Sequence, residues 1–193
     1  MKGKTIIVTG ASTGIGNAIA RLFIAKGSNV VMNSNNTDRL EKAYAELGKP
    51  TNAILLHGDV AQKETGEKLV KAALKEFGSV DVLINNAGVF SPKPFLDVEE
   101  SDLDLYLSIN FKGSYFAAQA VIPQMQKQQS GTIINMGTVL VDHAIAGFPA
   151  SAAVASKGAI HTFTRQLAAE YGKDNIKVNT ISPGIIRSPL QGK

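Results

Sequence analysis

The sequence predicts an α/β fold: a doubly wound parallel sheet of about six strands with helices on both faces, in three layers. Short β-branched runs alternate with longer stretches of helical period, the order that βαβ units produce. Several helical stretches end at glycine, the usual residue just past a helix. Right-handed crossovers place helices on both faces, and ligands bind such sheets at the carboxyl ends of the strands. Function is therefore expected in the loops that follow strands.

Each element is predicted by its own stretch of sequence. Runs rich in Val, Ile and Leu predict strands at 4–10, 28–34, 52–58, 81–85, 131–137 and 175–181. Apolar residues at helical spacing predict helices over 14–27, 38–48, 63–77, 101–128 and 151–172. Four helix ends are marked by glycine, at Gly27, Gly48, Gly78 and Gly172. Strands and helices thus alternate along the whole chain.

Size and composition predict one soluble domain. The chain has 193 residues, 44% of them hydrophobic, which is enough for one buried core. No apolar run approaches the roughly 18 residues of a membrane span. The absence of cysteine excludes disulfides, a thiol nucleophile and a Cys-ligated metal, and it suits a cytoplasmic location; no metal site is expected. The 20 basic and 16 acidic residues are scattered, so neither nucleic acid nor a membrane is an expected partner.

A glycine-rich turn follows the first predicted strand. Gly10, Gly14 and Gly16 join this strand to a helix, the context that a phosphate-binding turn requires. Gly10 permits the sharp turn, Gly14 lets the backbone approach a pyrophosphate, and Gly16 lets helix and strand pack closely. Backbone N–H groups at the helix start would bind the anion. Turns of this kind also occur without a ligand, so the hypothesis depends on the rest of the chain.

The glycine spacing resembles that of the short-chain dehydrogenase/reductase family, and five further motifs of the family follow in order. They are His57-Gly58-Asp59-Val60, Asn85-Asn86-Ala87-Gly88, Asn110, Ser156-Lys157 and Ser182-Pro183-Gly184. Six ordered matches are far more specific than any one of them. The resemblance implies a single Rossmann-type NAD(P)-binding domain over residues 1–193. It also implies hydride transfer to or from a small carbonyl or alcohol substrate.

By this resemblance, the cofactor-binding residues lie in the loops that follow strands. Asp59 accepts a hydrogen bond from the adenine amino group, although a simple strand-end cap is the alternative reading. Residues 86–88 pack against the cofactor ribose and also stabilise the sheet on their own, and residues 183–188 contact the nicotinamide carboxamide. The predicted cofactor-binding residues are Gly10, Ser12, Thr13, Gly14, Ile15, Gly16, Ser34, Asn35, Asp59, Val60, Asn86, Ala87, Gly88, Lys157, Pro183, Gly184, Ile186 and Ser188.

The end of the second predicted strand bears on the choice between NAD(H) and NADP(H). A carboxylate there would bind the ribose 2′-hydroxyl and repel a 2′-phosphate, whereas an arginine would pair with the phosphate. This sequence has Ser34 and Asn35 at those positions and no acidic residue before Asp38. The hydroxyl and amide donors favour NADP(H). Thr13, where a basic residue often assists NADP(H) binding, argues the other way.

The resemblance implies four catalytic positions, of which three are filled. Asn110 matches an asparagine that organises a water, and Thr138 keeps the hydroxyl that polarises the carbonyl. Lys157 matches a lysine that lowers the pKa of a tyrosine four residues earlier and also binds the ribose. That tyrosine position holds Ala153, and the seven-residue spacing of the enoyl-reductase branch gives Ala150.

Two functions remain open after the loss of this tyrosine. One is a slow or atypical oxidoreductase in which water or another residue supplies the proton. His143 is a candidate for that residue, because histidine is a common general acid, but it also fits an ordinary solvated loop position. The other is a dinucleotide-binding protein without catalysis, acting as a redox sensor or a partner subunit.

The family resemblance also implies self-association and a shortened C-terminal region. A homodimer or tetramer would form through helices 101–128 and 151–172, packed as a four-helix bundle. The alternative is that all apolar positions of these helices face the sheet. Family members continue past the Pro-Gly motif into a substrate lid, a helix and a last strand. Only residues 185–193 follow the motif here, so we expect the domain to lack these parts. The apolar positions of the first helix include Leu103, Leu107, Phe111, Tyr115, Phe116 and Val121.

Overall fold

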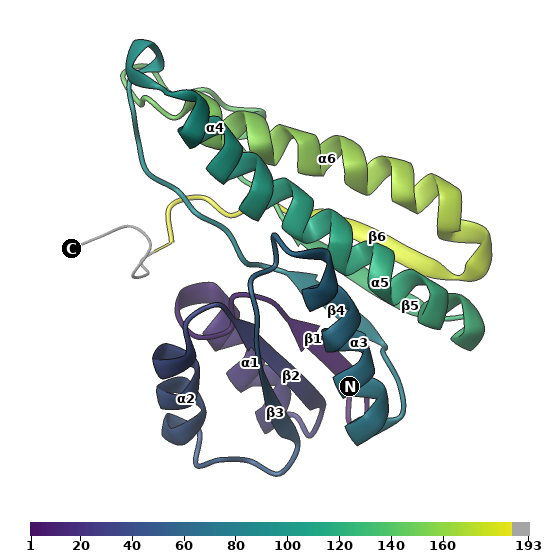
Figure 1. The fold of residues 1–193 in the computed structure, drawn as a ribbon. Helices are drawn as coiled ribbons and strands as arrows, with labels where there is room; N and C mark the ends of the chain where they lie inside the picture. The colour runs from purple at the N-terminus through teal and green to yellow at the C-terminus, as the bar shows by residue number, and fades with distance from the viewer. Residues whose placement is uncertain (187–193) are drawn as a thin grey trace.

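A computed structural model describes residues 1–186 as a six-stranded parallel sheet between helices (Figure 1). The strand order is β3-β2-β1-β4-β5-β6, and every neighbouring pair is parallel. The order reverses between β1 and β4, the place where doubly wound sheets bind ligands. The predicted fold and its strands are confirmed. The strands are β1 (Thr5–Val8), β2 (Asn29–Ser34), β3 (Ala53–His57), β4 (Val82–Asn85), β5 (Gly131–Met136) and β6 (Ile176–Ile181).

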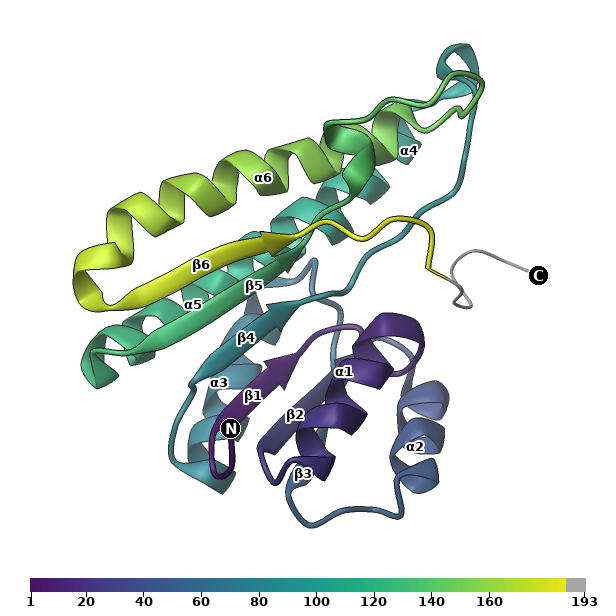
Figure 2. The ribbon, with the colours of Figure 1, turned by 180° about the vertical axis from the view of Figure 1, so that it is seen from behind.

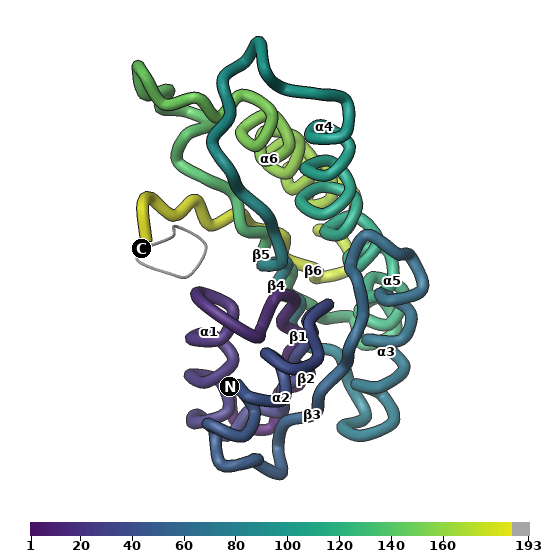
Figure 3. Tube along the Cα trace, turned by 60° about the vertical axis from the view of Figure 1, so that its left-hand side comes forward, coloured from purple at the N-terminus to yellow at the C-terminus, as the bar shows by residue number. Residues whose placement is uncertain are grey.

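Helices cover the sheet on two sides. Helices α1 and α2 lie on one face, and α3, α5 and α6 lie on the other (Figures 2 and 3). None of the helices within residues 1–186 is both long enough and apolar enough to cross a bilayer. The α-helices are α1 (Gly14–Ala25), α2 (Thr37–Glu46), α3 (Lys63–Phe77), α4 (Glu100–Tyr106), α5 (Gly113–Gln128) and α6 (Ser151–Tyr171). Shorter helices are η1 (Phe95–Asp97), the π-helix η2 (Leu107–Lys112), η3 (Val139–Val141) and η4 (Gly172–Asp174).

The core consists of two apolar layers, one on each face of the sheet. Side chains alternate along a strand, so Ile6 and Val8 of β1 pack toward α1 and α2 while Ile7 packs toward α3 and α5. All three side chains are fully buried. Burial on both faces explains why the central strands are continuously apolar rather than alternating. On the edge strand β6, Lys177 and Asn179 are exposed.

The predicted helix over 101–128 is wrong in one respect, because the structure divides it into α4, η2 and α5. The π-helix η2 contains Asn110, whose carbonyl oxygen accepts a hydrogen bond from Ser114 Oγ at 2.9 Å. A π-helical turn adds one residue without changing the apolar pattern on either side, so periodicity cannot reveal it. Single-turn π segments often lie at functional sites.

All four predicted glycines directly follow or lie just past the end of an α-helix, but one of them lacks the left-handed backbone. Gly27, Gly48 and Gly78 have φ values of 75° to 78°, the left-handed conformation expected of a helix stop. Gly172 has a φ of −58°, and α6 continues there into η4. Asn175, with a φ of 57°, provides the left-handed residue instead. Asparagine tolerates this conformation because its short side chain can form local hydrogen bonds.

Candidate functional site

A cleft of about 490 Å³ opens at the carboxyl ends of the strands. Residues that follow each of the six strands line it, so segments far apart in sequence converge at the point where the strand order reverses. Gly16 lies outside this lining, and Ser188 lies outside the described residues. The predicted site residues that line the cleft are Gly10, Ser12, Thr13, Gly14, Ile15, Ser34, Asn35, Asp59, Val60, Asn86, Ala87, Gly88, Asn110, Thr138, Lys157, Pro183, Gly184 and Ile186.

The glycine turn is tightly packed against the loop that follows β4. Gly10 has a φ of 65°, and a Cβ at this position would lie 2.8 Å from the Cα of Ala87. A Cβ on Gly16 would overlap the Gly10 carbonyl oxygen and the Asn86 side chain. Asn86 Nδ2 donates to the carbonyl oxygens of Thr9 and Gly10 at 3.0 and 3.2 Å. Glycine at positions 10 and 16 therefore lets the turn pack closely against the loop that follows β4.

The end of β2 is joined to the glycine turn by hydroxyl groups. Ser34 Oγ donates to Ser12 Oγ at 3.0 Å, and it accepts from the backbone N–H of Asn36 at 3.1 Å. Asn36 caps α2, since its Oδ1 accepts from the backbone N–H of Arg39 at 2.9 Å. Arg39 then lines the cleft together with Ser34 and Asn35. The cleft therefore contains a cation here, although residues 33–36 have none.

Arg39 is a site residue that the sequence reasoning missed. The sequence contains a feature that could have identified it. Asn36 is a typical N-cap residue, and an N-cap at this position places residue 39 in the first helical turn, beside the end of the strand. Asp59, expected near adenine, lines the cleft and also accepts a hydrogen bond from the backbone N–H of Ala61 at 3.0 Å. The Asp59 carboxylate thus makes the strand-end capping contact that was the alternative to adenine binding, and it also faces the cleft.

Asn110 and Lys157 meet at the far end of the cleft. Asn110 Oδ1 accepts from the Val89 backbone N–H at 2.8 Å, and Asn110 Nδ2 donates to Ser156 Oγ at 2.9 Å. Lys157 Nζ donates to the carbonyl oxygen of Met136 at 2.6 Å. A Cβ on Gly88 would lie 3.0 Å from Asn110 Oδ1 and 3.4 Å from Lys157 Nζ. Burial lowers the pKa of Lys157 to about 8.

Ala153 lines the cleft one helical turn before Lys157 and leaves no hydroxyl there. Its side chain is buried, in a cluster with Tyr106 and Ala152. Tyr106 offers no replacement, since its hydroxyl donates to the Ser91 carbonyl oxygen at 2.7 Å and accepts from the Ser91 N–H at 3.1 Å. The hydroxyl of Thr138 accepts from the Leu140 N–H at 3.3 Å, which leaves its own proton available to a ligand.

None of the three histidines lines the cleft. His143 is exposed, and His161 Nε2 lies 3.2 Å from Ser182 Oγ. The Nε2 atom of His57 lies 3.0 Å from the Asn35 carbonyl oxygen. Among the described residues, the titratable side chains that line the cleft are Arg39, Asp59 and Lys157.

One wall of the cleft is apolar, and sequence reasoning did not identify it. The rings of Phe90 and Phe148 stack with centroids 5.9 Å apart, which joins the loop after β4 to the loop before α6. These residues come from separate irregular segments, so no periodic pattern in the sequence marks them. The other apolar lining residues include Val89, Ile109, Val139, Leu140, Ile145, Val154 and Ile185.

Comparison with known proteins identifies the family. The sequence matches the profile described as short chain dehydrogenase over residues 4–193. It is 38% identical to Oxidoreductase UcpA of Salmonella typhimurium, over 98% of this chain and 72% of that protein. It is 35% identical to an uncharacterized oxidoreductase of Staphylococcus aureus, over 97% of this chain and 80% of that protein.

A solved structure from Sinorhizobium meliloti, described as a short-chain alcohol dehydrogenase, has the same fold. It superposes with a TM-score of 0.91 at 34% identity, over 100% of this chain and 76% of that one. The family match, the oxidoreductases among its relatives and the likeness of the fold agree. The chain belongs to the short-chain dehydrogenase/reductase family of oxidoreductases.

Proposed function

We propose that this protein is an NAD(P)-dependent oxidoreductase that acts on a carbonyl or alcohol substrate, with slow or atypical turnover. The observation that carries the proposal is the convergence in one cleft of the glycine turn, Asp59, Asn110, Thr138 and Lys157. A nicotinamide dinucleotide, when bound, supplies or accepts the hydride. The protein's part is to bind the cofactor, to orient the carbonyl with the Thr138 hydroxyl and to exchange a proton with the substrate oxygen.

The residues present fit a dinucleotide. Gly10 and Gly88 line the cleft without side chains, and a Cβ on Gly88 would press on Asn110 Oδ1 and Lys157 Nζ, where the cofactor would lie. Backbone N–H groups at the start of α1 would hold the pyrophosphate. Asp59 and Val60 would hold the adenine, while Lys157 would bind the nicotinamide ribose. Pro183, Gly184 and Ile186 line the end of the cleft where the carboxamide would lie.

We propose NADP(H) as the preferred cofactor. Arg39 lines the same cleft as the hydrogen-bonded Ser12 and Ser34 and would supply a positive charge to a 2′-phosphate bound at the end of β2. Guanidinium groups bind phosphate more strongly than neutral donors do. No carboxylate among the lining residues at the end of β2 would repel that phosphate, since Asp38 lies outside the lining.

We also propose a homodimer or tetramer through the helices that carry Asn110 and Lys157. Leu103, Leu107 and Tyr115 are 43%, 40% and 42% exposed, whereas Val121 is buried. The apolar residues nearer the amino end of this helical segment therefore do not all face the sheet. Sedimentation equilibrium that shows only monomer would contradict this part of the proposal.

The alternative function is a dinucleotide-binding protein without turnover, acting as a redox sensor or partner subunit. The observation that favours it is Ala153, whose methyl group can neither donate a proton nor orient a carbonyl. Cofactor oxidation across a broad panel of aldehydes and ketones separates the two functions. We expect slow turnover by the native chain and faster turnover by Ala153→Tyr. A native chain that binds cofactor but never turns over, beside an active Ala153→Tyr variant, would establish the alternative.

A further inference from the structure

Lys157 is the titratable group at the substrate end of the cleft. Of the three titratable side chains among the described lining residues, Arg39 and Asp59 follow β2 and β3, on the other side of β1. Lys157 instead lies on α6 beside the end of β5, where its Nζ bonds to Met136. Thr138 and the apolar wall line the same end.

We propose that Lys157 itself gives the proton to the substrate oxygen and takes it back in the reverse reaction. This inference rests on the proposed function and deepens it. Residues 153 and 157 lie one turn apart on the same side of α6, and both line the cleft. Because residue 153 ends in a methyl group, the chain places no titratable side chain there between the amine and a bound carbonyl. An ammonium has three N–H donors, and the Met136 carbonyl uses one of them.

The proton and electron balance of this step is simple. The carbonyl carbon receives a hydride, which a bound reduced nicotinamide would supply and thereby be oxidised. The oxygen, which takes the electron pair of the C–O π bond, removes a proton from the Lys157 ammonium. The products are the alcohol and a neutral amine, which regains a proton from water that enters the open cleft. In the oxidation direction, the neutral amine takes the alcohol proton as the hydride leaves. The hydroxyl of Thr138 donates to the same oxygen and holds it in place.

The electrostatic surroundings of Lys157 suit proton exchange near neutral pH. Burial lowers the pKa of its amine to about 8, whereas a solvated lysine stays mostly charged to about pH 10. An acid or base is most effective when its pKa is close to the working pH. The elements packed against α6 are α4, η2, η3, η4, β5 and β6, together with α5, whose Tyr115 ring stacks on Phe163 of α6. None of the other titratable groups on α6, on these elements or directly after η3 lines the cleft. These groups are Glu100, Asp102, Asp104, Tyr106, Lys112, Tyr115, Lys127, Asp142, His143, His161, Arg165, Glu170, Tyr171, Lys173, Asp174 and Lys177.

Lys157→Arg tests the role without removing the charge. Arginine keeps the positive charge and the N–H donors for a ribose but does not release its proton near pH 8. We expect NADPH to bind within a few-fold of the native affinity while turnover falls by about 10²–10⁴-fold. Lys177→Arg, a matched change on the exposed side of β6, should change neither quantity. Retention of native turnover by Lys157→Arg would overturn the inference.

The pH dependence of the native chain provides a second test that needs no variant. Carbonyl reduction requires the ammonium, so its rate should fall as pH rises through about 8. Alcohol oxidation requires the neutral amine, so its rate should rise over the same range. A lysine with a purely structural role would not produce these opposite trends. Profiles that run in the same direction for both reactions would contradict the inference.

Competitive acetylation with acetic anhydride gives a readout independent of activity. Mass spectrometry of the peptide containing Lys157 should show modification with a midpoint near pH 8, against about 10 for an ordinary solvated lysine. A midpoint near 10 for Lys157 would overturn the inference. Failure of the native chain to turn over any carbonyl would overturn the proposed oxidoreductase as well, whereas turnover retained by Lys157→Arg would overturn the inference alone.

Discussion

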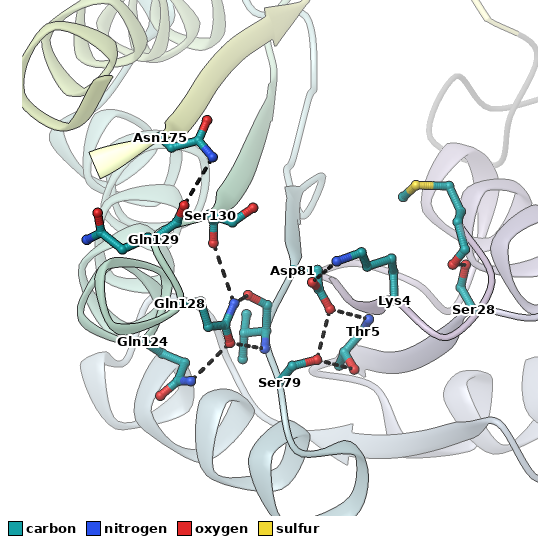
Figure 4. A network of polar contacts seen from close by, with 12 residues as sticks. Lys4, Thr5, Ser28, Ser79, Asp81, Gln124, Gln128, Gln129, Ser130 and Asn175 are labelled. Atoms are coloured by element: carbon teal, nitrogen blue, oxygen red, sulfur yellow. Dashed lines mark hydrogen bonds and ion pairs between the residues drawn. The ribbon is translucent and has the colours of Figure 1, made fainter. Parts of the chain in front are cut away.

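The two ends of the parallel strands use similar polar side chains for different purposes. At the amino ends, Asp81 accepts hydrogen bonds from Lys4 Nζ, the Thr5 N–H and Ser79 Oγ at 2.8, 2.9 and 2.8 Å (Figure 4). Nearby, Gln128 bonds to both the N–H and the carbonyl oxygen of Val80, at 3.0 and 2.9 Å. Polar groups at this end satisfy one another and hold the sheet together.

At the carboxyl ends, polar groups keep part of their hydrogen-bonding capacity. Ser12, Thr138 and Lys157 each have a partner within the chain, and each also lines the cleft. A polar group that forms only some of its possible hydrogen bonds contributes less to stability, but it can still bond to a ligand. We therefore expect substitutions at the amino ends to change stability, and substitutions in the cleft to change binding.

The largest effect on stability is expected from Asp81→Ala. The variant loses three hydrogen bonds and leaves the Thr5 N–H without its partner. Its free energy of unfolding should therefore be lower by about 2–3 kcal/mol. Partial burial raises the pKa of Asp81, but the hydrogen bonds from Lys4, Thr5 and Ser79 outweigh it and lower the pKa. The stabilisation is thus present above about pH 4 and lost as the pH falls through the lowered pKa. Urea unfolding of both chains at pH 7 and pH 3 measures this, and an equal gap at both pH values would contradict it.

Arg39→Ala should weaken cofactor binding without changing stability, the opposite of what is expected for Asp81→Ala. Arg39 is exposed in the first turn of α2, and its backbone N–H keeps the Asn36 cap in the variant. Thermal stability should stay close to native, while affinity for NADPH falls about tenfold, as expected for one charged hydrogen bond. Affinity for NADH should not change. Fluorescence titrations with NADPH and NADH provide the comparison. An equal loss of affinity for both cofactors would show that Arg39 does not determine the preference for NADP(H).

Lys157→Met should show that a cleft residue costs stability. The lysine pKa in the fold is about 8, below its value in the unfolded chain, so the unfolded state binds more protons between about pH 8 and 10. Native stability should therefore rise across this range, whereas the variant should show no such rise. We expect the variant to be more stable at pH 7 by on the order of 1 kcal/mol, a value reduced for partial solvent access. Denaturant unfolding of both chains at pH 7 and pH 10 measures this. The same difference in free energy of unfolding at both pH values would contradict the prediction.

The smallest effect is expected from Lys4→Ala. The ion pair between Lys4 and Asp81 lies partly in solvent, with 55% of the Lys4 side chain exposed. Exposed pairs contribute little and are screened by salt. Asp81 keeps its hydrogen bonds from Thr5 and Ser79 in this variant. Calorimetry should find a Tm within about 2 °C of native, and a loss as large as that of Asp81→Ala would show that the charge, rather than the hydrogen bonds, stabilises this end.

Periodicity was sufficient to predict the sheet, because the central strands bury both faces and each long helix buries one. The strand at 131–137, for example, corresponds to β5 at Gly131–Met136. The glycine turn was also predictable, since the positive φ of Gly10 is set within the turn itself and favours glycine. Such local requirements leave a direct trace in the sequence.

Features that depend on contacts between distant segments were not predictable in this way. The π-helix around Asn110 is accompanied by hydrogen bonds to Val89 and Ser156, which lie far from it in sequence. Arg39 enters the cleft because the Asn36 cap fixes the first turn of α2, and the Phe90–Phe148 pair joins two irregular segments. The family resemblance identified the missing hydroxyl at position 153, but only the structure shows which charged groups remain around it.

Binding of NADPH would show directly whether the cleft at the carboxyl ends of the strands is a dinucleotide site. Nicotinamide fluorescence serves as the signal, because the chain contains no tryptophan to interfere. Titration of the native chain should give saturable binding with one NADPH per chain. Gly88→Val, which fills the space beside Asn110 and Lys157, should weaken binding at least tenfold. No binding to the native chain at millimolar NADPH or NADH, or unchanged binding to Gly88→Val, would contradict the assignment of this cleft.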